Sequence, residues 1–354
     1  MNVLHTDKQE IKKLMGEKQK WRISNGVERT KNGRLFVAIA SGADYEDRLG
    51  NYVFVIKSDD DGKTWSEPIA LAYLGVDYRV NDAGLWISPK GELWFNFLVQ
   101  PENATYYTVC ANPDAEELSW SEVKFMAEGG KINKPTVLST GEWVFPVSVW
   151  NNVGKANTES YEVYSNRQQL SVSYDNGETI VPLGKSHVER RCCPEHMVLE
   201  MKDGSLNMYS RTWYGIAVSH SYDKGKTWTD GVDSGFGGPN SRFHIRRLKS
   251  GNILFINNFY NPLDKREWPK RTHLEVMIST DECKTFQGFM TLDDRCPVSY
   301  PDAIEGEDGY IYAISDYNRY VDKEILLHKF TEDDVLKGRI CNENSFLRKV
   351  IIKG

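Results

Sequence analysis

Four ionisable side chains recur at one distance from a glycine in this chain of 354 residues. They lie nine residues before a glycine that opens an apolar run: Asp82, Glu195, Arg242 and Tyr300. Carboxylates and phenols exchange protons, and an arginine holds an anion by several hydrogen bonds. If the repeated positions are structurally equivalent, these side chains line a site for a polar ligand.

The glycines belong to a repeat that indicates the fold. Six times a turn residue and a glycine precede a β-rich apolar run, at intervals of 47 to 63 residues: Gly33, Gly91, Gly141, Gly204, Gly251 and Gly309. Each interval has room for four short strands, so the repeat predicts an all-β fold, a six-bladed β-propeller of four-stranded antiparallel blades. A β-sandwich is the alternative, but it does not predict six evenly spaced hairpins. The innermost strands of a propeller line its channel, which makes the nine-residue positions equivalent; Ser24 and Ile132 occupy them in the first and third repeats.

A second repeat, S-x-D-x-G-x-T followed by an aromatic or aliphatic residue, needs no ligand. It occurs at residues 58–65, 173–180 and 221–228, and again at 279–286, where Cys283 replaces the glycine. Ser and Asp side chains accept hydrogen bonds from turn amides, and glycine accepts a positive φ. Because every requirement is local, this motif predicts structural hairpin turns.

The composition narrows the class of protein. With 40% hydrophobic residues the chain can bury a full core, and its 10 Trp, 18 Tyr, 14 Phe and 28 Gly favour strands and turns. A net charge of −6 offers no basic surface for nucleic acid. No apolar run reaches the ~20 residues of a membrane span. The six cysteines lack the spacing of a zinc site, and the adjacent Cys192 and Cys193 suit reduced thiols.

We expect one propeller domain over residues 21–354, preceded by a helical extension over residues 1–20. Helical patterns cover residues 7–19 and 331–338. The first 21 residues are charged throughout and lack the apolar stretch of a signal peptide. This favours a cytoplasmic location, although a secreted protein whose leader was removed would look the same. The oligomeric state stays open.

From about residue 21 to 318 the chain resembles the sialidase (neuraminidase) superfamily of six-bladed propellers, whose Asp boxes are turns of the second repeat. The segment "WRIS" is similar to the R-I-P motif of that family, with Ser in place of Pro, and matches Arg22 to the first family arginine. The segment "EHMVLEMKDGSLNMYSR" is similar to the family pattern E-x-x-V-x-E-x-x-D-G-x-L followed by an arginine. It supplies Glu195 and Arg211.

Further segments extend the resemblance. "KRTHLEVMISTDECKTF" supplies Arg271 as the third arginine, and "SYPDAIEGEDGYIY" supplies Tyr300 as the nucleophile. Asp82, in "RVNDAGLW", matches an aspartate near the ring substituents of the substrate. The acid/base aspartate of the family lies on a loop between the first arginine and the first Asp box. There "SGADYEDRLGNY" offers Asp44 and Asp47, of which we prefer Asp44.

The resemblance implies a retaining exo-glycosidase for a terminal α-linked sialic acid or a related acidic sugar. Three arginines would hold the sugar carboxylate by charge-assisted, partly bidentate hydrogen bonds. That carboxylate would repel an anionic nucleophile by about 4 kcal/mol at ~4 Å. The neutral phenol of Tyr300 avoids this repulsion, and Glu195 accepts its proton. Arg242 would add a contact to the substrate, and neither a metal nor an organic cofactor is implied.

Two other classes of function stay open. One is a hydrolase or lyase for another acidic sugar, such as a uronate, in which the arginines bind carboxylate and Tyr300 has a different role. The other is a non-catalytic propeller that binds glycans, although the presence of both Tyr300 and Glu195 argues against binding alone. In each case the expected partner is a carbohydrate, and neither nucleic acid nor a membrane.

Overall fold

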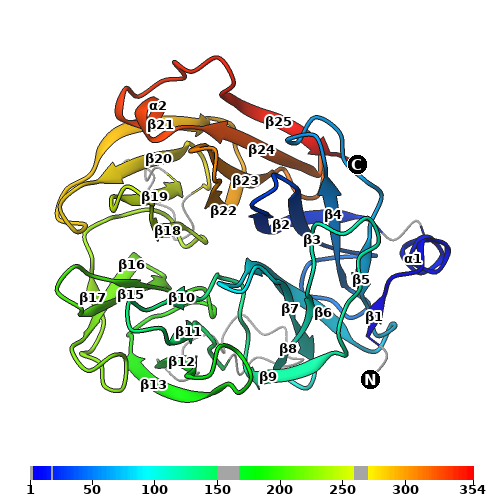
Figure 1. Cartoon of the computed structure of the whole chain (residues 1–354), viewed down its shortest axis with the longest axis horizontal. Helices are drawn as coiled ribbons and strands as arrows, with labels where there is room; N and C mark the ends of the chain where they lie inside the picture. Colours follow the sequence, from blue (N-terminus) through cyan, green and yellow to red (C-terminus); the bar gives the residue numbers. More distant parts are fainter. Residues whose placement is uncertain (1–2, 17–18, 150–166, 259–269) are drawn as a thin grey trace.

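Short β-rich runs between glycine turns build an all-β protein. The computed structural model describes residues 3–16, 19–149, 167–258 and 270–354. Its strands form six antiparallel sheets arranged in a ring (Figure 1). The six-bladed β-propeller predicted from the glycine repeat is confirmed.

Each blade contains four consecutive strands, which pair in sequence order within their sheet. The strands of blades 1 to 3 are β2 (Trp21–Arg29), β3 (Leu35–Gly42), β4 (Tyr52–Ser58) and β5 (Ala70–Ala72); β6 (Arg79–Ile87), β7 (Leu93–Gln100), β8 (Ala104–Cys110) and β9 (Lys124–Glu128); and β10 (Thr136–Val137), β11 (Trp143–Phe145), β12 (Arg167–Ser173) and β13 (Val181–His187). Those of blades 4 to 6 are β14 (Met197–Glu200), β15 (Leu206–Thr212), β16 (Gly215–Ser221) and β17 (Val232–Asp233); β18 (His244–Arg247), β19 (Ile253–Asn258), β20 (Leu274–Ser279) and β21 (Gln287–Asp293); and β22 (Val298–Glu305), β23 (Ile311–Tyr317), β24 (Glu324–Phe330) and β25 (Phe346–Ile352).

The first strand of each blade ends shortly before one of the repeat glycines. All six glycines have a positive φ, which a tight turn between two antiparallel strands requires. The nine-residue positions therefore fall near the start of the first strand in every blade, on equivalent places around the ring.

The ring closes between blade 6 and blade 1 through side chains. The Ser24 hydroxyl donates to the backbone oxygen of Tyr300 at 2.8 Å, and the Val27 amide donates to Asp302 Oδ2 at 2.9 Å. Blade 1 keeps four consecutive strands and gains β1 (Leu4–His5) as a fifth, paired with β5. The N-terminal segment is thus attached to the edge of the propeller.

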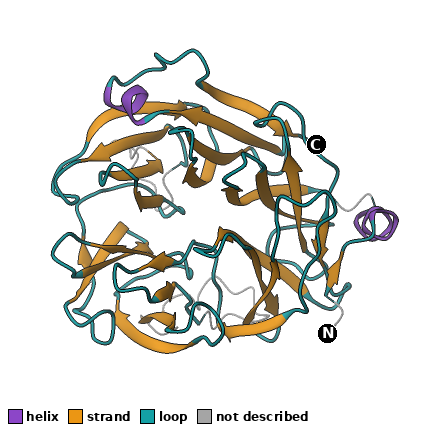
Figure 2. Ribbon diagram, viewed as in Figure 1, coloured by secondary structure: helices purple, strands orange, loops and turns teal. Residues whose placement is uncertain are grey.

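Two helices lie outside the ring (Figure 2). Helix α1 (Lys8–Met15) begins where Asp7 accepts a hydrogen bond from the Glu10 amide, and it buries Ile11 and Met15 against blade 1. Helix α2 (Glu332–Leu336) begins with a capping box of Thr331 and Asp334 between β24 and β25. Both helices fall within the segments predicted to be helical.

The S-x-D-x-G-x-T turns join the third and fourth strands of blades 1, 3, 4 and 5. In the first, Ser58 Oγ accepts from the Gly62 amide at 2.9 Å, while Asp60 accepts from the Thr64 amide and hydroxyl at 2.8 and 2.6 Å. The degenerate fourth copy keeps this geometry, with Cys283 at a φ of 64°. Local hydrogen bonds satisfy the turn, as the sequence predicted.

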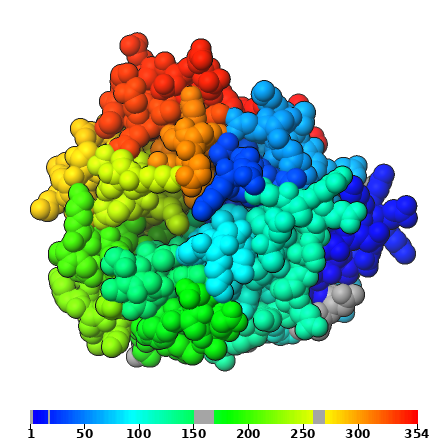
Figure 3. Space-filling view, viewed as in Figure 1, coloured from blue at the N-terminus to red at the C-terminus, as the bar shows by residue number. Residues whose placement is uncertain are grey.

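Aromatic side chains pack between neighbouring blades. Between blades 2 and 3, Trp143 meets Trp86 edge to face at 4.9 Å and Trp94 edge to face at 5.9 Å. Such buried pairs add about 0.5–1.5 kcal/mol each beyond the area they bury. The blades form a fixed frame around a centre that is visibly hollowed on the face drawn in Figure 3.

Candidate active site

Tyr300 lies near the start of β22 in an unusual backbone conformation. Its φ is 56°, and the register of β22 against β23 shifts between Ser299 and Asp302. A bulky residue in this region costs about 1–3 kcal/mol and stays there only where its surroundings fix it. The hydrogen bond from Ser24 to the Tyr300 carbonyl is one such restraint, and the side chain is only 7% exposed. Tyr300 is therefore held in one orientation.

Glu195 and Arg211 meet the Tyr300 hydroxyl. This hydroxyl donates to Glu195 Oε1 at 2.6 Å, and Arg211 Nη1 donates to Glu195 Oε2 at 2.7 Å and to the Tyr300 oxygen at 3.3 Å. Arg211 projects from β15, and Asn240 fixes its guanidinium by accepting from Nε at 2.6 Å and from Nη2 at 3.1 Å. All three side chains are buried.

The electrostatics of this trio define its resting state. Burial and the negative charge of Glu195 raise the pKa of Tyr300 well above its ordinary value. Burial opposes the charge of Arg211, but Glu195, together with Cys193, Cys192 and Tyr300, outweighs burial and raises the pKa of Arg211. A neutral phenol thus faces a carboxylate that can accept its proton directly.

Two more arginines lie over the Tyr300 ring. The Arg271 guanidinium carbon is 5.5 Å and that of Arg319 is 4.7 Å from the ring centre. Arg271 donates to the Asn240 carbonyl at 3.2 Å, and no carboxylate of the described residues forms an ion pair with it. Burial, followed by repulsion from Arg211 and Arg319, lowers the pKa of Arg271. We call Glu46, Glu195, Arg211, Arg271, Tyr300 and Arg319 the tyrosine cluster.

Arg319 was not predicted from the sequence. It follows β23, and its guanidinium donates to Glu46 Oε2 at 2.6 Å and to Ser299 Oγ at 2.9 Å. Burial raises the pKa of Glu46, but Arg319 and Arg271 outweigh burial and lower it. The cluster therefore holds three arginines and two carboxylates.

Arg22, the predicted first arginine, makes its described side-chain contacts outside the tyrosine cluster. Its Nη2 donates to Gln19 at 2.7 Å, and its charge interacts with Tyr52 of blade 1. Its backbone amide donates to the Arg319 carbonyl at 2.9 Å. The two arginines are thus neighbours in the backbone, but the side chain over the Tyr300 ring is that of Arg319.

The loop that carries the two acid/base candidates is solvent-exposed. The Asp44 side chain is 61% exposed and lies 4.0 Å from Arg48, and Asp47 is also exposed. Between them Glu46 points inward to Arg319. The loop therefore reaches the cluster through a glutamate that the sequence analysis did not single out.

Asp82 occupies in β6 the place that Tyr300 occupies in β22. Its φ is 46°, and the register against β7 shifts between Asn81 and Gly84. Burial raises the pKa of Asp82 to about 6, opposed by Arg79 and supported by the charges of Glu195 and Glu46. A carboxyl group that titrates near pH 6 beside Glu195 can donate or accept a proton at neutral pH.

Arg242 lies outside the cluster. It is fully buried, and it donates to Asn133 at 2.8 Å and to the Asn25 carbonyl at 2.8 Å. It belongs to a set of paired charges between the inner strands, which we call the channel network: Glu28, Lys134, Arg242, His244 and Asp302. This network positions the inner strands, and no part of the Arg242 side chain is exposed to a ligand.

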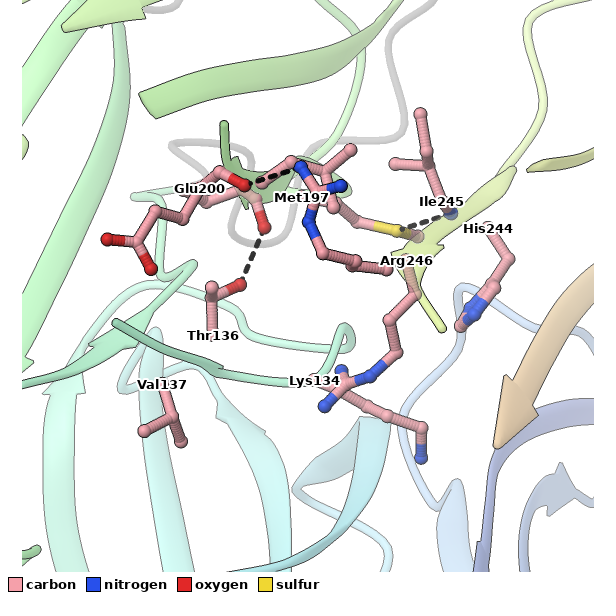
Figure 4. Close-up of a pocket in the computed structure, with 11 residues that line it drawn as sticks. Lys134, Thr136, Val137, Met197, Glu200, His244, Ile245 and Arg246 are labelled. Carbon is pink, nitrogen blue, oxygen red and sulfur yellow. Dashed lines mark hydrogen bonds between the residues drawn. The ribbon is translucent and has the colours of Figure 1, made fainter. Parts of the chain in front are cut away.

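A pocket of about 210 Å³ lies farther along the inner strands, toward the glycine turns (Figure 4). Its walls come from β10, β14 and β18 and include Thr136, Met197 and Arg246. None of its lining residues belongs to the tyrosine cluster. The cluster is therefore defined by its contacts and not by this cavity.

Comparisons with known proteins place the chain in a family. The model of the BNR repeat-like domain matches residues 12–313. The chain belongs to the BNR repeat-like domain family. An anhydrosialidase from Macrobdella decora is 30% identical over 172 residues, which cover 45% of this chain and 20% of that protein.

Solved structures share the fold of this BNR repeat-like chain. A protein of unknown function from Dyadobacter fermentans matches with a TM-score of 0.65 and 17% identity, covering 86% of this chain and 92% of that one. A leech intramolecular trans-sialidase matches with a TM-score of 0.64 and 12% identity, covering 92% and 70%. The sialidase-type propeller with BNR repeats expected from the sequence is confirmed.

Two further findings concern the described part of this BNR repeat-like chain. It contains no group of three or more His, Cys, Asp or Glu side chains arranged to hold a metal ion. It also contains no helix that is long and apolar enough to cross a membrane.

Proposed function

We propose that the protein is a retaining exo-glycosidase that releases a terminal sialic acid or a related acidic sugar. The observation that carries this proposal is the 2.6 Å hydrogen bond from Tyr300 to Glu195, with Arg211 bonded to both. A phenol next to a buried carboxylate is the nucleophile and base pair that a substrate with an anomeric carboxylate needs.

Arg211, Arg271 and Arg319 form the proposed carboxylate site. A guanidinium presents parallel donors that match a carboxylate in two-point contact. Arg271 supports this role best, because the other two arginines already hold Glu195 and Glu46. A bound carboxylate would relieve the mutual repulsion that lowers the pKa of Arg271.

The reaction proceeds by two displacements at the anomeric carbon. The Tyr300 oxygen attacks this carbon while its proton passes to Glu195, and the leaving oxygen takes a proton from an aspartate. The same aspartate then removes a proton from water, whose oxygen attacks the anomeric carbon while the sugar–tyrosine bond breaks. The Tyr300 oxygen takes its proton back from Glu195, and the product has the configuration of the substrate.

Release of a fluorogenic aglycone from an α-linked sialoside tests the proposal. Tyr300→Phe removes the nucleophile and leaves the arginines in place, so we expect turnover to disappear while binding of free sialic acid stays measurable. Mass analysis of the product separates hydrolysis from formation of an anhydro sugar, the ligand seen in the leech enzyme. Unchanged turnover in Tyr300→Phe would remove the nucleophile assignment.

Absence of any turnover in the wild type, with sialic acid still bound, would favour a glycan-binding propeller. Release from a uronoside in place of a sialoside would redirect the proposal to uronate-type substrates. In that case Tyr300→Phe distinguishes a nucleophile from another role, because a covalent sugar–enzyme adduct would not form without the nucleophile.

Asp44 or Asp47 is the proposed acid/base residue, and Asp82 is the alternative that its pKa of about 6 favours. An acidic phenol leaves without a proton, whereas the hydroxyl of a sugar does not. Replacing the true acid with Asn should therefore lower turnover of a sialyl-oligosaccharide by about 10²- to 10⁴-fold, with a much smaller loss on an aryl sialoside. Asp44→Asn, Asp47→Asn and Asp82→Asn are each assayed on both substrates. The variant with a large loss on the sialyl-oligosaccharide and a small loss on the aryl sialoside identifies the acid.

A further inference from the structure

We propose that Cys192 and Cys193 form a reversible vicinal disulfide that switches the tyrosine cluster off. Their sulfur atoms lie 3.3 Å apart as free thiols, two and three residues before Glu195. The proposed base, Glu195, and this dithiol are thus parts of one short segment.

The segment that carries the dithiol is anchored on both sides of Cys193. The Cys192 amide donates to the Arg211 carbonyl at 3.0 Å, which ties this residue to the strand that carries the arginine. On the other side of Cys193, Pro194 packs against Gly130, where an added methyl group would lie only 2.9 Å from Pro194 Cγ. With both neighbours fixed, a change of geometry at the two cysteines passes to Glu195.

The electrostatic environment makes Cys192 the more reactive thiol of this pair. The hydrogen bond from the Cys193 thiol, against the effect of burial and with help from Arg211, lowers the pKa of Cys192 to about 6. Thiolates are the reactive form of cysteine. Cys192 is 4% exposed and Cys193 is half-buried, so a molecule as small as a hydroperoxide is the suitable oxidant.

The chemistry balances with one hydroperoxide. The Cys192 thiolate attacks a peroxide oxygen, the O–O bond breaks, and a sulfenic acid and water (or an alcohol) result once the leaving oxygen is protonated. The Cys193 sulfur then attacks the sulfenic sulfur, a second water leaves with the Cys193 proton, and the S–S bond forms. Two thiols are oxidised by two electrons, and the peroxide is reduced.

Strain makes the bond reversible and disruptive. A disulfide needs sulfurs ~2.05 Å apart and usually joins Cα atoms 4.4–6.8 Å apart, whereas neighbouring residues with a trans peptide lie ~3.8 Å apart. Strained disulfides are reduced readily. Closing the bond must therefore reorient the 192–193 peptide, where Cys193 already has a φ of 61°, and move Glu195 away from Tyr300.

The test uses the full chain with the exposed Cys296 and Cys341 changed to Ser, which prevents cross-linking between molecules. Hydroperoxide treatment should remove two hydrogen atoms from the intact mass, and a digest without reductant should place the S–S bond in the 192–193 peptide. Amide hydrogen exchange around Glu195 and Tyr300 should increase, turnover should fall at least about tenfold, and dithiothreitol should reverse every change.

Cys193→Ser in the same background is the matched control, since it keeps the size of the side chain and cannot form the bond. It should keep turnover and hydrogen exchange unchanged after a brief peroxide treatment. A disulfide at 192–193 that leaves hydrogen exchange at Glu195 unchanged overturns the switch, and absence of the disulfide overturns the site. Because mass and hydrogen exchange need no substrate, these outcomes are independent of the proposed glycosidase activity.

Discussion

The tyrosine cluster and the channel network are two sets of charged side chains that meet at β22, which carries Tyr300 and Asp302, and they differ in how their charges are paired. In the channel network Asp302 lies within 3.0 to 3.5 Å of Lys134, His244 and Arg242, and Lys134 also binds Glu28 at 2.7 Å. In the tyrosine cluster, within the described residues, Arg271 donates to a backbone carbonyl, and repulsion from two other arginines exceeds its attraction to Tyr300 and Glu46.

This difference separates charged side chains that stabilise the propeller by pairing with one another from charged side chains that a ligand would pair. Buried ions are tolerated where partners replace the lost water, and removal of one partner leaves the other uncompensated. Where burial and neighbouring cations lower the pKa of a cation, its charged form is unfavourable, and a bound anion would stabilise that form. Pairing, more than burial or charge, tells the two kinds of site apart.

The largest expected effect is on stability, in Asp302→Ala. This change leaves Lys134 with Glu28 as its one carboxylate and removes the ion pair of Arg242. Breaking a buried pair on one side costs about 3–5 kcal/mol, so the free energy of unfolding in urea should fall by that amount.

Arg271→Ala is the matched change in the tyrosine cluster. Because its charge is repelled by Arg211 and Arg319, its loss should lower the free energy of unfolding by less than about 1 kcal/mol while weakening the binding of carboxylate sugars. Equal destabilisation by Asp302→Ala and Arg271→Ala would contradict the distinction between charges paired within the protein and charges that a ligand would pair. So would equal loss of affinity for sugars that lack a carboxylate.

The next effect is on affinity and compares Arg319→Lys with Arg22→Lys. Lysine keeps the charge but loses the two-point geometry of guanidinium. Charge-assisted hydrogen bonds contribute about 1.5–3 kcal/mol, so Arg319→Lys should raise the Kd for sialic acid about 10- to 100-fold, and Arg22→Lys less than about threefold. Calorimetric titration measures both, and the reverse order would restore Arg22 as the first arginine of the site.

The fold could be predicted because the sequence patterns that specify it are local. Part of the site could not be predicted, because it depends on how distant segments pack together. Six turn glycines are enough to count the blades, and one constant offset finds Asp82, Glu195 and Tyr300. The same offset selects Arg242, because sequence spacing cannot distinguish a residue that faces a ligand from one that faces Asp302. Arg319 follows a second strand and so lies outside the repeat on which the prediction rested.

Glu46 illustrates the same limit on a loop. It stands between two aspartates that match the family pattern, and only the three-dimensional course of the loop brings it, and not them, to Arg319. A motif that matches Asp44 does not identify the charged residue two positions later, whereas the ion pair of Glu46 with Arg319 in the structure does.

The smallest effect is the pH dependence of stability that Asp82 introduces. Its pKa of about 6 in the folded protein lies above the ordinary 3.8, so between these values the folded state keeps a proton that the unfolded state releases. The wild type therefore loses stability as pH rises from about 4 to 6, and the loss is complete above that range. Asp82→Asn cannot ionise, so it should match the wild type near pH 4 and exceed it by about 1–2 kcal/mol at pH 8, a value reduced by partial solvent exposure.

Urea unfolding at several pH values measures this difference, with Asp44→Asn as the control because that side chain is exposed and should change the free energy of unfolding by less than about 0.5 kcal/mol. A gain at pH 8 that is absent at pH 4 would place Asp82 with Arg271, among groups whose charge is unfavourable before a ligand binds. A constant difference at all pH values would instead place it with the paired charges of the channel network. The result thus decides whether the carboxylate of Asp82, which burial, Glu195 and Glu46 disfavour, belongs with the charges that a ligand would pair.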